Sequence, residues 1–210
     1  LNTIQSISQK EVQMKLAIII GTTRQGRKTP QQAKWVANTA KQMEDVEVEL
    51  IDLKDYPMPF FDEPISPRYN PDRQIDPAVK PWLDKLTAAD AYVFVTPEYN
   101  HSITGVLKNA MDYVTWELQR KPAQVVSHGA AGGARAATDL KEILSESKAV
   151  PLPSSSPLAM AGMSEMIDEE GNLSEAAKAR PYGPQAALEA MLEELKWYSD
   201  ALAAARGADK

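Results

Sequence analysis

The stretch Ala91-Tyr92-Val93-Phe94-Val95-Thr96-Pro97-Glu98-Tyr99-Asn100-His101-Ser102 decides how this chain folds. Its first five residues are small, β-branched or aromatic, which is typical of a buried strand. Pro97 has no backbone N–H to donate to a neighbouring strand, so we expect the strand to end there. In an open parallel sheet, ligands bind in the loops that follow the carboxyl ends of the strands. The residues from Pro97 to Ser102 are therefore predicted to face a ligand.

Further strands are predicted on both sides of this stretch. Lys15–Ile20 is a short apolar run, as expected for a strand buried on both faces of a sheet, and Pro122–His128 is a further strand that ends in a loop of small residues. Val46–Ile51 alternates before it becomes wholly apolar, which indicates a strand near a sheet edge. Ala149–Leu152 is a weak fifth strand whose prolines suit an edge.

Helical patterns alternate with these strands. They are expected from Thr29 (as N-cap, with Pro30 at the first helical position), over about Ile75–Ala88, from about Thr104, over Ala134–Glu146, and over about Pro184–Ala204. Strands that alternate with helices predict an α/β fold with a parallel sheet covered on both faces. Between them, Asp55–Arg73 is rich in proline and aromatic residues, and we expect a long loop there.

Length and leading residues predict the domain organisation. With 210 residues the chain is long enough for one α/β domain with a substantial core. Residues 1–13 are polar and lack a hydrophobic period, so we interpret them as a disordered or artificially added extension before a single domain over 14–210. No apolar run is long enough to cross a bilayer and no signal peptide is recognisable, so no membrane partner is expected.

Composition argues against several kinds of site and partner. The absence of cysteine excludes disulfides, thiolate metal ligands and cysteine nucleophiles, and it fits a cytoplasmic location. A net charge of −6 argues against nucleic acid as a partner, because phosphate binding leaves a basic imprint. With only two histidines, His101 and His128, no metal site is expected.

Three loops are predicted to converge at the carboxyl edge of the sheet: Thr22–Thr29, Pro97–Ser102 and Ser127–Gly133. The first combines hydroxyls, cations and a helix N-terminus, which together suit a phosphate group. The glycines of the third allow the backbone to approach a flat ring closely. The three loops together predict a ligand with a phosphate at one end and a planar, hydrogen-bonding group at the other.

A nucleotide-hydrolysing loop is the first alternative. Gly21 and Gly26 followed by Lys28-Thr29 come close to the glycine-rich loop of the nucleotide triphosphatases. Arg27, however, separates Gly26 from Lys28, and this breaks the adjacency that such a loop needs. This alternative predicts magnesium-dependent nucleotide hydrolysis.

With the loops described, the chain resembles a known family, the NADPH-dependent FMN reductases. The resemblance is carried by Gly21–Arg27, by Pro97–Ser102, by the sequel Gly105–Asp112 and by Gly129–Gly133. It implies a flavodoxin-like three-layer sandwich around a five-stranded parallel sheet of order 2-1-3-4-5. It also implies FMN as the cofactor, with NADPH or NADH as the reductant. The implied FMN contacts are Thr22, Arg24 and Arg27 at the phosphate, and Pro97, Glu98, Tyr99, Asn100, Ser127 and Gly129 around the ring.

The resemblance implies an enzyme in which the flavin carries the redox chemistry. Hydride would pass from NAD(P)H through bound FMN to a small-molecule acceptor, such as a quinone, an azo compound or a flavin, in a ping-pong cycle. No side chain is expected to be catalytic. A second alternative is a flavodoxin-like electron carrier, or an interaction protein, that binds FMN without turning over NAD(P)H.

Large apolar residues expected to be exposed predict self-association. Tyr113, Trp116 and Leu118 lie off the apolar stripe of the helix expected from Thr104. Large apolar side chains exposed in this way are typical of a subunit interface. We therefore expect a homodimer or a homotetramer.

Overall fold

A computed structural model describes residues 14–153, 156, 158 and 162–208, so the predicted extension over 1–13 lies outside the described residues. All five strands are parallel and pair in the order β2-β1-β3-β4-β5, which confirms the order that the family resemblance implies. The strands are β1 (Met14–Ile20), β2 (Val46–Asp52), β3 (Ala91–Pro97), β4 (Pro122–His128) and β5 (Val150–Pro151).

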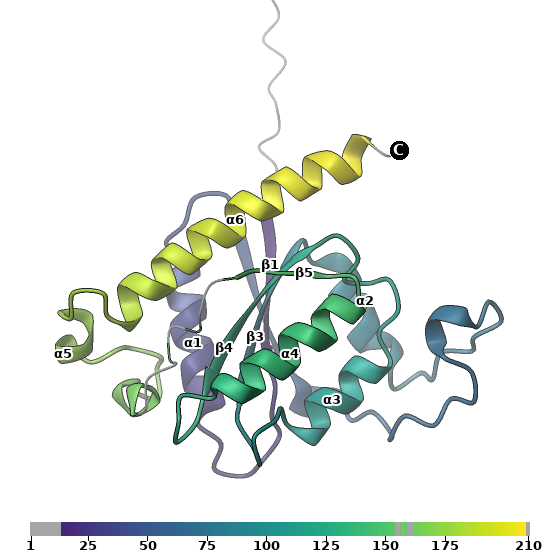
Figure 1. Ribbon diagram of the computed structural model, residues 1–210, viewed down its shortest axis with the longest axis horizontal. Helices are drawn as coiled ribbons and strands as arrows, with labels where there is room; N and C mark the ends of the chain where they lie inside the picture. Colours follow the sequence, from purple (N-terminus) through teal and green to yellow (C-terminus); the bar gives the residue numbers. More distant parts are fainter. Residues whose placement is uncertain (1–13, 154–155, 157, 159–161, 209–210) are drawn as a thin grey trace, which may run out of the picture.

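Helices cover both faces of the sheet, and they make it the middle layer of a three-layer sandwich (Figure 1). Alternate residues of each strand point to opposite faces. Ile18 and Val93 pack in the core shared with α1 (Thr29–Ala40) and α6 (Pro184–Ala208). Ile19 and Phe94 pack in the other core, beneath three further helices. These are α2 (Lys80–Ala88), α3 (Gly105–Asp112) and α4 (Ala134–Glu146).

Two helices begin elsewhere than predicted because a side chain near the start makes another contact. Thr29 is the first residue of α1 rather than its N-cap, because Lys28 occupies the cap position and the Thr29 hydroxyl bonds to His128. Helix α2 begins at Lys80, later than expected, after a turn in which the Asp76 carboxylate accepts the Ala78 amide. Thr104 does cap α3, and its hydroxyl accepts the Leu107 amide at 3.1 Å.

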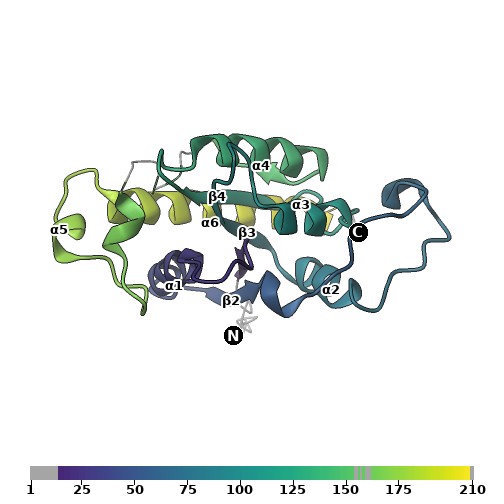
Figure 2. The ribbon, with the colours of Figure 1, turned by 90° about the horizontal axis from the view of Figure 1, so that it is seen from below.

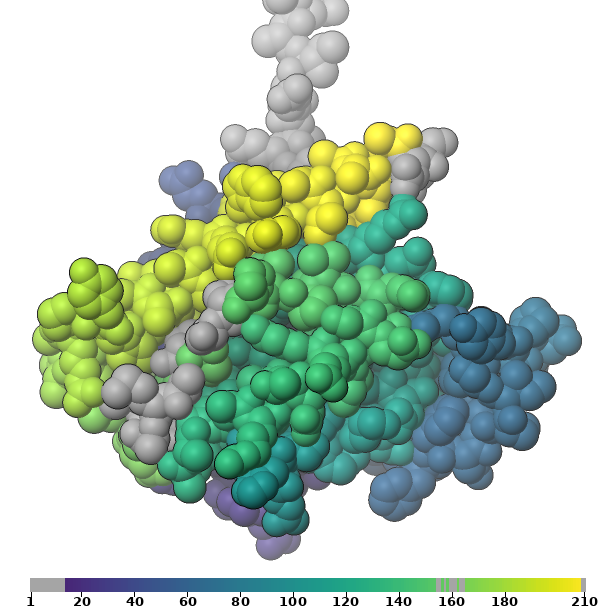
Figure 3. Space-filling view, in the orientation of Figure 1, coloured from purple at the N-terminus to yellow at the C-terminus, as the bar shows by residue number. Residues whose placement is uncertain are grey.

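The segment after β2 forms an arm rather than part of the sandwich. It contains the short helices η1 (Leu53–Asp55) and η2 (Pro67–Tyr69), and Figure 3 shows it as a blue lobe at one side of the molecule. The predicted long loop over Asp55–Arg73 is thus confirmed. Arg73 and Glu63, both largely buried, pair within the arm at 2.7 Å and hold its shape.

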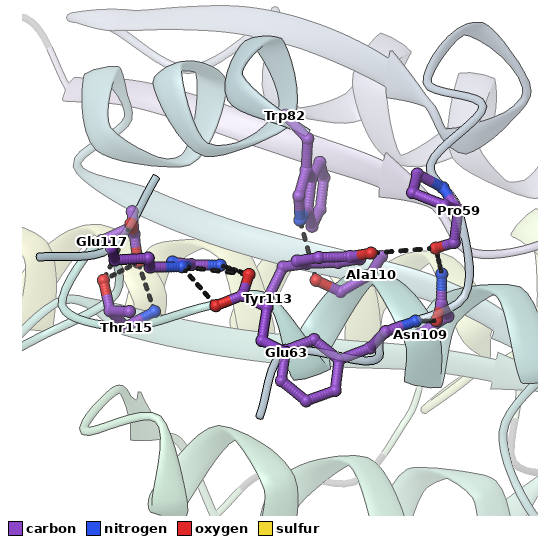
Figure 4. Close-up of polar contacts among 10 residues, drawn as sticks. Pro59, Glu63, Trp82, Asn109, Ala110, Tyr113, Thr115 and Glu117 are labelled. Atoms are coloured by element: carbon purple, nitrogen blue, oxygen red, sulfur yellow. Dashed lines mark hydrogen bonds and ion pairs between the residues drawn. The ribbon is translucent and has the colours of Figure 1, made fainter. Parts of the chain in front are cut away.

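Helix α3 anchors the base of this arm (Figure 4). The Asn109 side-chain amide donates to the Pro59 carbonyl at 2.7 Å and accepts the Phe61 amide at 2.9 Å. The Tyr113 hydroxyl donates to the same Pro59 carbonyl at 3.1 Å, and its ring packs edge-on against Phe61. Tyr113 is therefore buried, which corrects the expectation that it lies exposed at an interface.

The end of α3 explains this correction. The helix ends at Asp112, so the residues after it do not continue the helical stripe that the sequence predicted. The chain turns there and buries Tyr113 and Leu118, while Trp116 remains half exposed beneath the Arg68 guanidinium.

Along the described part of the chain, no helix is long and apolar enough to cross a bilayer.

Candidate functional site

The predicted loops do converge at the carboxyl edge of the sheet. They follow β1, β3 and β4 and meet at the bottom of the molecule in Figure 1, the side that faces the viewer in Figure 2. A hollow of about 440 Å³ lies among them and is called the edge pocket below. Its lining is Arg24, Gly26, Arg27, Lys28, Thr29, Pro97, Tyr99, His128, Gly129, Ala130, Gly162 and Glu165.

Arg27 fixes the shape of the loop after β1. Its guanidinium donates two parallel hydrogen bonds, of 2.7 and 2.5 Å, to the carboxylate of Asp52 at the end of β2. It also donates to the Thr22 carbonyl within the same loop. The Arg27 side chain is only 12% exposed, so this bidentate pair is shielded from water and holds the loop to the neighbouring strand.

Arg24 offers an unneutralised cation to the edge pocket. Its guanidinium lies over the Tyr99 ring, 5.2 Å from the ring centre, and within the described part of the chain no carboxylate lies in ion-pair range of it. The Tyr99 hydroxyl lies 3.3 Å from that of Thr22, which joins the loops after β1 and β3. Arg24 is thus preplaced by a cation–π contact and remains available to an anion.

The loop after β4 meets the first loop through two buried residues. The Thr29 hydroxyl lies 3.0 Å from Nε2 of His128, and both side chains are buried. The pKa of His128 is lowered to about 4, chiefly by burial; Glu165 acts in the opposite direction, and the nearby Arg24 acts in the same direction as burial. The imidazole is therefore neutral at physiological pH and can serve as a fixed hydrogen-bonding partner for Thr29.

Glu98 joins the loops after β3 and β4. Helix α4 has Gly133 at its N-cap, which has no side chain to accept the first helical amides. The Glu98 carboxylate supplies the missing acceptor, because it takes the Arg135 amide at 3.0 Å and pairs with the Arg135 guanidinium at 3.3 Å. The Glu98 amide also donates to the His128 carbonyl at 2.8 Å. The Glu98 side chain is 10% exposed, and its contacts hold the loops after β3 and β4 together.

Unusual backbone conformations shape the loops after β3 and β4. Gly133 has a left-handed φ of 74°, and a Cβ added there would lie 2.7 Å from the His128 amide nitrogen. Asn100 also has a positive φ, of 49°, in a tight turn in which Tyr99 and Ser102 exchange backbone hydrogen bonds of 2.9 and 3.0 Å. Both turns need conformations that few residues adopt without strain.

The predicted contact residues do not all line the edge pocket. Five of them do, namely Arg24, Arg27, Pro97, Tyr99 and Gly129. The other four lie behind or beside it. Thr22 and Ser127 are buried beneath the loops, Glu98 braces them, and Asn100 is exposed at its turn.

Some residues of the edge pocket were not predicted, because their partners are distant in the chain. Lys28 lines the edge pocket and pairs at 2.5 Å with Glu165, which comes from the short helix η3 (Met163–Met166). Gly162, in the same segment, also lines it. No motif marks the C-terminal segment. His128, by contrast, is the last residue of a predicted strand, and that position was the available signal.

The edge pocket suits a ligand with one phosphate and one flat ring. Its volume of about 440 Å³ lies in the range of roughly 300–1,000 Å³ that is usual for ligand pockets. Arg24 and the N-terminus of α1 favour an anion at one end, and the α1 helix dipole adds to this. Backbone of Pro97 and Gly129 borders the other part, where a ring can approach closely. These residues fit the phosphate and the ring of FMN.

Metal chemistry has no comparable support in the residues that the structure describes. Among them, no group of three or more His, Cys, Asp or Glu side chains is placed to hold a metal ion. Asp52, the acidic residue at the end of β2, is engaged by Arg27. A magnesium-dependent nucleotide hydrolase would use a carboxylate in such a position for its metal, so this pairing disfavours the nucleotide-hydrolysing alternative.

Comparison with known proteins gives an independent result. Residues 14–162 match the family described as NADPH-dependent FMN reductase. An NAD(P)H-dependent FMN reductase of Schizosaccharomyces pombe is 37% identical over 129 residues, which are 61% of this chain and 64% of that protein. An NAD(P)H:quinone oxidoreductase of Solanum tuberosum is 34% identical over 107 residues, 47% of this chain and 50% of that protein. The chain thus spans less than two thirds of the length of either relative.

Solved structures support the fold. The flavoenzyme NAD(P)H:acceptor oxidoreductase FerB of Paracoccus denitrificans superposes with a TM-score of 0.67 at 22% identity. The superposition covers 88% of this chain and 98% of that one. An oxidoreductase of Corynebacterium diphtheriae gives a TM-score of 0.65 at 19% identity, over 90% of this chain and 98% of that one.

Proposed function

The chain belongs to the NADPH-dependent FMN reductase family, and from this premise we propose that it is an FMN-dependent oxidoreductase. In this proposal it takes reducing equivalents from NAD(P)H and passes them to a quinone, an azo compound or a flavin in a ping-pong cycle. The observation that supports it most is the edge pocket itself. Three loops distant in sequence meet there around the uncompensated Arg24.

The residues of the edge pocket divide into those that bind and those that position. Arg24 and the first turn of α1 would hold the phosphate, and the backbone of Pro97, Tyr99 and Gly129 would border the ring. Arg27 and Glu98 would act through the loops that they hold, since both are already paired within the protein. When bound, FMN supplies the hydride chemistry, and the protein supplies orientation and electrostatics.

The buried contact between Thr29 and His128 closes the inner end of the edge pocket. A neutral imidazole there adds no positive charge and leaves Thr29 fixed at the start of α1. Closing this end keeps water away from one side of the ligand, which strengthens the electrostatic interactions of the loops with it. This division of roles requires no catalytic side chain.

Two spectroscopic observations test the proposal. The purified protein, incubated with FMN and freed from excess, should show the absorption bands of oxidised flavin. Mixing it with NADPH or NADH in a stopped-flow instrument without oxygen should bleach those bands, and adding a quinone should restore them. Bound flavin that no pyridine nucleotide bleaches would instead support an electron carrier. Protein without flavin bands would contradict the proposal.

A further inference from the structure

Glu165 places a negative charge on the rim of a pocket that is otherwise built for an anion. Among the described residues that line the edge pocket, it is the only acidic one. Its carboxylate pairs with Lys28 at 2.5 Å, and both side chains are more than half exposed, so the pair lies on the outer rim. A carboxylate beside a phosphate-binding loop weakens anion binding, and its presence there calls for a functional explanation.

We propose that Glu165 makes the edge pocket select a flavin that ends in a phosphate monoester over one that continues into a pyrophosphate. In terms of cofactors, it selects FMN over FAD. The inference rests on the proposed function, because it assumes that the edge pocket holds the flavin phosphate. It assigns to Glu165 a role in ligand choice.

The closed inner end of the pocket determines where a longer ligand must go. Thr29 and His128 line the inner side of the pocket, where they are buried and 3.0 Å apart, whereas Lys28 and Glu165 are the exposed part of its lining. A chain that continues beyond the first phosphate therefore leaves across the outer rim. Lys28 and Glu165 stand at this rim, on two segments that approach each other from opposite ends of the sequence.

The charges of the pocket are sufficient for one phosphate and unfavourable for two. Arg27 is neutralised by Asp52 and Lys28 by Glu165, which leaves Arg24 and the dipole at the N-terminus of α1 for a first phosphate. A second phosphate would need Lys28 as its counterion. Withdrawing Lys28 would leave the Glu165 carboxylate unpaired next to a pyrophosphate, and like charges at such distances repel. A monoester leaves the ion pair intact.

Calorimetric titration of the full chain, stripped of flavin, tests this selection. FMN and FAD are titrated separately into the wild-type protein, Glu165→Gln and the control Glu170→Gln. Glu170 belongs to the same segment and loses the same charge, but it does not line the edge pocket. In Glu165→Gln we expect the ratio of the FAD to the FMN dissociation constant to fall about tenfold, chiefly because FAD binds more tightly. Glu170→Gln should keep the wild-type ratio.

A second variant moves the ratio in the opposite direction. Lys28→Gln leaves the Glu165 carboxylate without its counterion, so FAD should lose more affinity than FMN and the ratio should widen. An unchanged ratio in Glu165→Gln, or an equal change for both flavins, would overturn the inference while wild-type FMN binding still supported the proposed function. A wild-type protein that binds neither flavin would contradict both.

Discussion

Two hollows of similar size can be compared in this protein. The edge pocket, of about 440 Å³, lies where the loops after β1, β3 and β4 meet. A second hollow of about 530 Å³, the helix groove, lies between α1, α6 and the turn at Gly171, with Trp35 and Leu192 in its lining. The helix groove has apolar side chains at its base and amide and charged side chains at its edge. The edge pocket has a cation without a paired carboxylate, a helix N-terminus and two loops with strained backbone.

The comparison shows that volume alone does not locate a site. A parallel sheet aligns the carboxyl ends of its strands at one edge, so residues far apart in sequence gather there. The walls of the helix groove come from packed helices, and its cation Lys178 is paired locally with Glu175. If the edge pocket is the flavin site, matched changes in the two hollows should affect flavin binding in only one of them.

The largest expected effect comes from a pair of glycines. Gly133→Ala would force a side chain into a left-handed position and against the His128 backbone at 2.7 Å. The strain and overpacking together should lower the free energy of unfolding by about 3 kcal/mol or more. The flavin should be lost with the loop. Thermal unfolding and calorimetric FMN titration measure the two effects.

Gly171→Ala is the matched change in the helix groove. Gly171 also has a left-handed φ, of 82°, and an added Cβ would lie 2.6 Å from the Trp35 amide nitrogen. It should destabilise the protein to a similar extent and leave FMN affinity unchanged at temperatures where the variant is folded. Loss of FMN from folded Gly171→Ala, or its full retention by Gly133→Ala, would contradict the assignment of the edge pocket.

The next effect comes from removing one cation from each hollow, Arg24 from the edge pocket and Lys178 from the helix groove. Arg24→Ala removes a charge-assisted contact worth roughly 1.5–3 kcal/mol, so FMN should bind about 10- to 100-fold more weakly. Lys178→Ala, at the rim of the helix groove, should change FMN affinity by less than about twofold. Fluorescence quenching of FMN gives both dissociation constants. Equal affinities for the wild type and Arg24→Ala would refute the role of Arg24.

Glu98 should give a smaller effect. Glu98→Ala removes the acceptor for the first turn of α4, and loss of a helix cap lowers the free energy of unfolding by about 1 kcal/mol. Glu98→Gln keeps one oxygen and should cost less. FMN affinity should fall in the same order, since both loops lose their brace. If both variants bind FMN as the wild type does, the brace has no part in the site.

The last effect is a dependence of stability on pH, and it appears only below neutral pH. The pKa of His128 is about 4 in the folded protein and 6.5 when unfolded, so the unfolded chain binds the proton more readily between these values. Stability should fall as pH decreases from 6.5 towards 4, by at most about 1.4 kcal/mol per pH unit from this residue. Above pH 6.5 the residue contributes no pH dependence.

The contribution of His128 is measured by difference. Denaturant unfolding of the wild type and His128→Gln between pH 4 and pH 8 separates it from the carboxylates, which titrate in both proteins. Glu165 and Arg24, which face the imidazole in the wild type, are present in both proteins as well. The two curves should converge as pH falls. Parallel curves would show that His128 is accessible to protons in the folded state.

Much of the fold was predictable because burial leaves a simple pattern. Strands covered on both faces are continuously apolar, and the predicted ranges around Ile18, Val93 and Val125 are all strands. Helix α4 begins and ends where the pattern predicts. The start of α2 was missed because a turn capped by Asp76 precedes the helix proper. The burial of Tyr113 was missed because periodicity does not show where a helix ends.

The site was predictable only in part, for a related reason. Loops next to predicted strands could be placed at one edge by topology alone, which brought Arg24, Tyr99 and Gly129 together correctly. Partners that approach through tertiary packing could not be placed. Nothing local to Lys28 indicates an ion pair with Glu165, 137 residues away, and nothing local to Thr29 indicates its contact with His128.

The most direct test of the account is a crystal structure of the protein with FMN. We expect the ligand in the edge pocket, its phosphate within hydrogen-bonding distance of Arg24 and next to the N-terminus of α1, and its ring along Pro97 and Gly129. A flavin found in the helix groove, or an edge pocket filled by protein side chains while flavin binds elsewhere, would contradict it.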